Sequence, residues 1–158
     1  MTSDGLSLEQ RDSQHARTLK VRIPPNARLS GSVRREVLSF AGSLEISRDE
    51  LEEFICAVGE ALANALEHAG NGDMIEVRCQ IEDDKILATI VDSGSGFKDG
   101  PVTDVSLPDA LAERGRGLPI MRRCTDIFAV HSVPGRGTAV VLGRYLRRAA
   151  KDRNIIAS

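Results

Sequence analysis

The chain has 158 residues, of which 41% are hydrophobic and 28% are charged, and its formal net charge is −2. This composition is typical of one globular domain, and the near-neutral charge argues against direct nucleic-acid binding. Three cysteines far apart argue against a disulfide framework or a zinc site, and no apolar run approaches the roughly 18 residues of a membrane helix, so we expect a cytoplasmic protein.

The N-terminal third predicts a tail, a strand and a first helix. Residues 1–15 are polar and show no periodicity, which predicts a mobile tail. The stretch "RTLKVRIP" alternates apolar and charged residues, which is typical of a half-buried strand, and prolines end it. Apolar residues then recur at helical spacing from residue 26 to about residue 41.

A longer helix is predicted from Ser47 to about Ala69. Ser47 and Glu50 have the spacing of a capping box, in which two side chains satisfy free backbone groups at a helix start. Glycines 70 and 72 predict its end. The apolar residues fall on one side of a helical wheel, which predicts the core face. They are Leu51, Phe54, Ile55, Val58, Ala61, Leu62, Ala65, Leu66 and Ala69.

The C-terminal half predicts a hairpin, a long loop, a short helix and a second hairpin. Residues 75–92 contain two apolar strands joined by "EDDK". Residues 94–117 contain five glycines and two prolines, and a loop of this length is usually functional or disordered. Residues 118–124 predict a helix, "DIFAVHSV" and "GTAVVLG" predict strands, and residues 147–158 form a basic tail.

Glu60, Asn64 and His68 are spaced by four residues in "EALANALEHAG", on the side of the wheel away from the core. On spacing alone this is an ordinary solvated face, with His68 near the last carbonyl groups of the helix. Asn64 is discordant, because asparagine is a poor helix former. Its amide oxygen is a suitable Mg²⁺ ligand, and a carboxylate one turn away can deprotonate a nucleophile.

Asp92 stands at the end of a predicted strand in "IVDSGSGF". A carboxylate there can accept a hydrogen bond from an exocyclic amine, and Gly94 and Gly96 let the backbone approach a flat ligand closely. The alternative is an ordinary turn, in which Asp and Gly are common.

A second glycine pair, Gly115 and Gly117, precedes the short helix in "RGRGLPIM". A helix start presents free N–H groups and binds anions, and Arg114 and Arg116 add charge suited to phosphate. A helix start with solvated arginines explains the same pattern. The third element is "GRGTAVVL", in which Thr138 follows a glycine at a strand start, and by itself this is a hairpin.

Together and in this order, "AVGEALANALEHAG", "DSGSG", "ERGRGLPIMRRCTD" and "GT" resemble the Bergerat ATP-binding fold of the GHKL superfamily. The resemblance covers about residues 17–145 and is closest to the small bacterial anti-sigma serine kinases. It implies an α/β two-layer sandwich, with a mixed, mostly antiparallel sheet and helices on one face. The histidine kinase-like ATPase domain would occupy residues 16–146.

The resemblance also implies roles for the matching residues. Glu60 would be the general base that activates the acceptor hydroxyl, Asn64 the Mg²⁺ ligand, and Asp92 the group that binds the adenine amine. The remaining implied contacts are Gly94 and Gly96 at the adenine pocket, Thr138 through water, Gly115 and Gly117 at the phosphates, Arg114 or Arg116 at the γ-phosphate, and Arg34 at a protein partner.

The implied function is an ATP- and Mg²⁺-dependent protein-serine kinase of a partner-switching system. It would phosphorylate a STAS-domain antagonist and restrain a sigma factor, and homodimers are common in the family. Two alternatives stay open: a nucleotide-gated binding module without catalysis, and the ATPase half of a histidine kinase acting in trans. His15 has too few residues before the first strand for a phosphoacceptor hairpin, so we expect the acceptor on another protein.

Overall fold

The structure is a computed structural model that describes residues 6–13, 16–70, 72–82, 84–94, 117–133 and 135–146. Its elements in chain order are β1 (Ser7–Ser13), β2 (Ala16–Ile23), η1 (Ala27–Leu29), α1 (Ser30–Ala41), α2 (Arg48–His68), β3 (Ile75–Ile81), β4 (Lys85–Asp92), α4 (Gly117–Arg123), β5 (Ile127–Val133) and β6 (Gly137–Tyr145).

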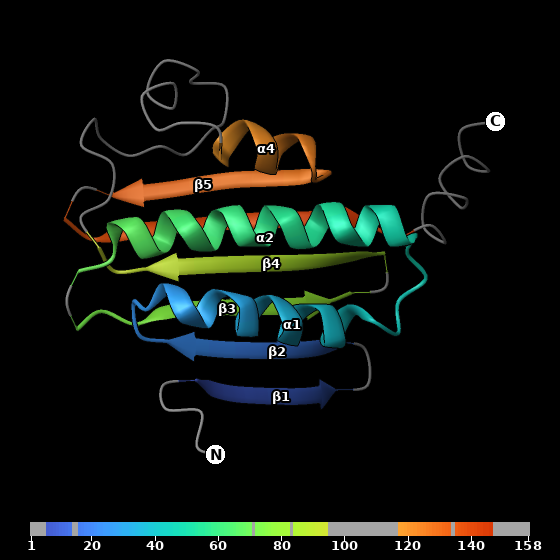
Figure 1. The fold of residues 1–158 in the computed structure, drawn as a ribbon. Coiled ribbons are helices and arrows are strands. Elements are labelled where there is room, and N and C mark those ends of the chain that lie inside the picture. The colour runs from blue at the N-terminus through green and yellow to red at the C-terminus, as the bar shows by residue number, and fades with distance from the viewer. Residues whose placement is uncertain are drawn as a thin grey trace.

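The strands form one sheet in the order β1-β2-β3-β4-β6-β5, and all pairings between the described strands are antiparallel. Helices α1 and α2 run across one face of this sheet, and α4 packs beside α2 at the β5 edge (Figure 1). The predicted α/β sandwich with helices on one face is therefore confirmed. Both predicted hairpins, β3–β4 and β5–β6, are present.

The prediction of a tail over residues 1–15 is wrong for Ser7–Ser13, which pair antiparallel with β2 as an edge strand. The backbone makes these ladder bonds, so an edge strand can form with little hydrophobic patterning. Leu8, its one large apolar residue, is 45% exposed and leaves no alternating signal in the sequence.

Helix α2 begins and ends close to its predicted bounds. The Ser47 hydroxyl oxygen accepts the Glu50 backbone N–H at 3.1 Å, and the Glu50 carboxylate accepts the Ser47 N–H at 3.3 Å, which completes the predicted capping box. The buried side is largely the predicted one, and Ala57 is buried with it. No helix among the described ranges is long and apolar enough to cross a membrane.

The core lies between α1, α2 and the inner face of the sheet. Alternate residues of the strands point into it because successive side chains of a strand point to opposite faces. Each fully buried Val, Leu or Ile side chain among them contributes about 1.5–3 kcal/mol to folding. The buried strand residues include Leu19, Val21, Ile23, Ile75, Val77, Cys79, Ile86, Ala88, Ile90, Val140 and Leu142.

A largely buried arginine joins α2 to the turn between α4 and β5. Arg144 of β6 donates from Nη2 to the Glu53 carboxylate at 2.9 Å, and its Nη1 lies 3.9 Å from Asp126. Asp126 also accepts the Tyr145 backbone N–H at 2.9 Å. Through these contacts Arg144 connects α2 to the segment that follows α4.

Candidate functional site

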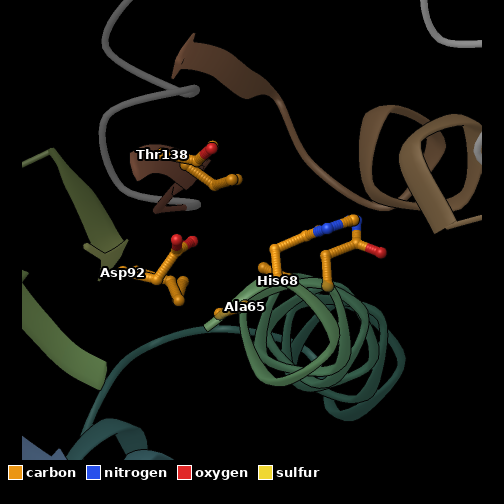
Figure 2. A pocket seen from close by; sticks show the side chains of 8 residues that line it. Ala65, His68, Asp92 and Thr138 are labelled. Atoms are coloured by element: carbon orange, nitrogen blue, oxygen red, sulfur yellow. The ribbon is translucent and has the colours of Figure 1, made fainter. Parts of the chain in front are cut away.

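A pocket lies between the C-terminal half of α2 and the adjoining ends of β4 and β6 (Figure 2). It contains Asn64, Asp92 and Thr138, which come from three separate sequence motifs. The sheet register explains this convergence, because Asp92 at the end of β4 pairs with Thr138 at the start of β6. The other lining residues are Ala61, Ala65, His68, Ile90 and Val140.

The polar groups of the pocket are divided between its two walls. Asp92 and Thr138 are paired on the strand wall, and His68 lies across from them on the helix wall (Figure 2). Asn64 is one turn before His68 on α2 and is half-buried. Small apolar side chains, including Ala61 and Ala65, cover the helix wall between the polar groups. The pocket therefore combines an apolar surface with a few fixed polar groups, the usual character of a small-molecule site.

Asp92 is only 5% exposed, and its Oδ1 accepts the Gly94 backbone N–H at 3.0 Å. Burial raises the pKa of this carboxyl above its ordinary value. Backbone hydrogen bonds from Gly94 and Thr138 and the proximity of His68 act in the opposite direction. Asp92 is thus an acceptor that the backbone orients within the pocket.

Two glycines are required where the strands and the helix approach each other. A Cβ on Gly94 would collide with the carbonyl oxygen of His68 at the end of α2. Gly137 has a φ of +106°, and a Cβ there would collide with the carbonyl oxygen of Asp92. Both glycines therefore allow two backbone segments to approach each other closely at the pocket. For Gly94 the sequence analysis predicted a close approach to a ligand, and it did not predict this contact with the end of α2.

Neither Glu60 nor Arg34 is among the residues that line the pocket. Glu60 is half-buried, one turn before Asn64 on α2. Arg34, on α1, is exposed, and its side chain lies over Gly59, where a Cβ would come within 3.2 Å of Arg34 Cδ. Because Gly59 has no side chain, Arg34 can lie against it, and Gly59 directly precedes Glu60 in the chain.

Gly96, Arg114, Gly115 and Arg116 lie outside the described residues, as does most of the predicted loop. Gly117 is the first residue of α4.

The chain matches the family of histidine kinase-like ATPase domains over residues 23–144. It is 32% identical over 122 residues to the anti-sigma F factor of Caldanaerobacter subterraneus subsp. tengcongensis, covering 73% of this chain and 84% of that protein. It is 30% identical over 144 residues to the serine-protein kinase RsbW of Bacillus velezensis, covering 85% and 89%. The chain belongs to the anti-sigma factor kinase family. The family named in our sequence analysis is thereby confirmed.

A solved structure agrees with this anti-sigma kinase fold. The histidine kinase domain of the blue-light-activated histidine kinase from Erythrobacter litoralis EL346 has a TM-score of 0.55 and 19% sequence identity. The match covers 82% of this chain and 64% of that one, and it shows that the two share a fold.

The donor chemistry of the anti-sigma kinase pocket fits a nucleotide-bound Mg²⁺ ion. Asn64 supplies a neutral amide oxygen, the hard ligand type that Mg²⁺ takes together with water and phosphate oxygens. Within the described ranges, no group of three or more His, Cys, Asp or Glu side chains could hold a metal ion.

Sequence reasoning missed Ser132, a fully buried residue of β5. Its Oγ lies 2.9 Å from Thr138 Oγ1 and donates to the Gly137 carbonyl oxygen at 3.4 Å. The alternation in "DIFAVHSV" could have identified Ser132 as a buried polar residue, because Phe128 and Val130 point inward and Ser132 follows them on the same face.

The raised pKa of Asp92 predicts a pH-dependent effect of Asp92→Asn on the nucleotide-free protein. A carboxyl whose pKa is higher in the folded than in the unfolded chain costs stability once it ionises. We expect the variant to melt at a higher temperature than the wild type at neutral pH, since asparagine still accepts the Gly94 N–H without carrying charge. The difference should shrink as the pH falls through the raised pKa toward about 4, the ordinary value for Asp. Thermal melts across this range measure it, and a less stable variant at neutral pH would contradict the assignment.

Proposed function

We propose that this protein is an ATP- and Mg²⁺-dependent protein-serine kinase, and that its substrate is a serine of a STAS-domain antagonist. The observation that carries the proposal is the convergence of Asn64, Asp92 and Thr138 in one pocket, with Glu60 one helical turn away. Relatives named serine-protein kinase, including RsbW of Bacillus subtilis at 27% identity over 146 residues, support the same activity.

Each wall of the pocket has its own part in ATP binding. On the strand wall, Asp92 accepts a hydrogen bond from the adenine amine, and Thr138 contacts the same edge directly or through water. On the helix wall, Asn64 holds a nucleotide-bound Mg²⁺, which supplies positive charge against the phosphate oxygens. Gly117, where α4 begins near α2, is assigned to the phosphates.

Phosphoryl transfer then depends on a proton acceptor beside the pocket. The oxygen of the partner serine bonds to the γ-phosphorus, the bond from that phosphorus to the β–γ bridging oxygen breaks, and ADP leaves. Glu60 takes the serine proton as a general base. We assign Arg34, which is exposed next to Gly59, to contact with the protein that brings the serine to Glu60. The remaining catalysis is positioning and charge neutralisation.

The relatives named anti-sigma F factor support a second role for the same surface. We propose that the protein also binds and restrains a sigma factor when the STAS antagonist is absent. This exchange would take place in the cytoplasm, and a homodimer is the assembly we propose for it.

The test is to incubate the protein with Mg-ATP and a STAS-domain partner and to weigh the partner by mass spectrometry. We expect an increase of one phosphoryl group on a serine, stable in acid. An acid-labile phosphoramidate would instead indicate a histidine kinase acting in trans. An unmodified partner that still binds in an ATP-dependent way would indicate a nucleotide-gated binding module. The absence of any ATP binding to folded protein would overturn the proposed function.

A further inference from the structure

We propose that Asp73 is a positioning residue for the end of the pocket assigned to adenine. Its carboxylate fixes the end of α2, and the end of α2 in turn holds Asp92 in the orientation that accepts the adenine amine. The inference rests on the proposed nucleotide site and deepens it, because it adds a residue that determines base selectivity without contacting the base. Asp73 lies between α2 and β3 and is not among the residues that line the pocket.

The chain leaves α2 abruptly, and Asp73 closes the turn that follows. The Ala69 N–H still donates to the Ala65 carbonyl oxygen at 2.8 Å, but the backbone of Ala69 is extended. The next residue, Gly70, uses both of its backbone groups on Asp73. Its N–H donates to Asp73 Oδ2 at 2.9 Å, and its carbonyl oxygen accepts the Asp73 N–H at 3.2 Å. A single residue therefore fixes the path of the backbone as it leaves the helix.

The segment that follows Asp92 packs against this end of α2. The carbonyl oxygen of His68, the last residue of α2, lies so close to Gly94 that a Cβ on Gly94 would collide with it. Gly94 in turn donates its N–H to Asp92 Oδ1 at 3.0 Å. The contacts thus form one chain from Asp73 to Asp92.

A shift of the α2 end would therefore reach the Asp92 carboxylate. The Gly94 N–H orients this carboxylate, and the strength of a hydrogen bond depends steeply on its angle. If the end of α2 moves, Gly94 is released from its contact, and Asp92 loses its alignment toward the base. A site built to pair with a donor distinguishes ligands by that hydrogen bond. A purine with an amine at position 6 then loses its advantage over one with an oxygen there.

The experiment compares dissociation constants for ATP and ITP, which differ in the group at position 6 of the base, by calorimetry with Mg²⁺. We expect the wild type to prefer ATP. Asp73→Ala should lower this preference roughly two- to tenfold, the range for one hydrogen bond of ordinary strength. Asp73→Asn should retain the preference, because its amide oxygen can still accept the Gly70 N–H.

Gly70→Ala disturbs the same contact from the other side. The added Cβ would come within 2.8 Å of Asp73 Oδ2, which is the end of a side chain and can turn away. Gly70 is not among the glycines with a positive φ, so alanine fits its backbone conformation. The variant should lose the ATP preference as Asp73→Ala does, with a melting temperature near that of the wild type. Gly70→Ala/Asp73→Ala should lose no more than either single variant, because both remove one contact.

The ATP/ITP ratio separates this role from a general structural one. A variant that is merely destabilised binds both nucleotides less well by the same factor. Gly70→Ala supplies the measurement if Asp73→Ala does not fold. An unchanged ratio in these variants, the same loss in Asp73→Asn, additive losses in the double variant, or equal binding of ATP and ITP by the wild type overturns the inference. In all these cases ATP still binds, whereas a wild type that binds neither nucleotide overturns the proposed function itself.

Discussion

Replacing Glu60 with Gln is expected to lower the rate of phosphoryl transfer to the STAS partner by roughly 10²–10⁴-fold, the usual contribution of a general base. Glutamine has the shape of glutamate but cannot take up the serine proton. ATP affinity should change little, because Glu60 is not among the residues that line the pocket. Single-turnover transfer and calorimetry with Mg-ATP measure the two quantities on the same preparation.

Two further variants on α2 make this result specific. Glu67→Gln removes an exposed carboxylate of the same helix and should transfer at the wild-type rate. Asn64→Ala should have the opposite profile from Glu60→Gln: ATP binding should lose its dependence on Mg²⁺, because the amide oxygen that holds the ion is gone. Transfer by Glu60→Gln at the wild-type rate would show that another group is the base.

Replacing Gly137 with Ala should destabilise the protein by about 3 kcal/mol or more, because two costs coincide. A φ of +106° is unfavourable for any residue with a side chain, and the added Cβ would collide with the Asp92 carbonyl oxygen. That oxygen is backbone within a paired strand, so it can move only if the β4–β6 ladder opens. Opening the ladder would separate Asp92 from Thr138 and weaken ATP binding as well.

Gly135 provides the matched control for this prediction. It lies in the same turn with a φ of +73°, but a Cβ there would meet no atom within 4 Å. Gly135→Ala should therefore carry only the conformational cost of the left-handed region, about 1–2 kcal/mol. Urea unfolding of both variants measures the difference, and equal losses would mean that the crowding at Gly137 contributes nothing.

Local sequence patterns were sufficient for most of the elements. The spacing of Ser47 and Glu50 identified the start of α2, and alternation identified β2 to β4, because these signals arise between residues that are neighbours in the chain. Strand β1 was missed because an edge strand pairs through its backbone and requires little hydrophobic alternation. The roles assigned to Asn64, Asp92 and Thr138 came from the resemblance of whole motifs to a family and remain predictions.

The sequence by itself determined the family, the sandwich fold and the residue types that belong to the site. The tertiary structure alone decided which of them meet. Register and packing are relations between segments distant in the chain, so only the folded sheet places Asp92 opposite Thr138 and both beneath α2. Ser132 likewise meets its hydroxyl partner, Thr138, only when β5 pairs with β6. Gly94 must lack a side chain because the carbonyl oxygen of His68, at the end of a helix distant in the sequence, lies against it.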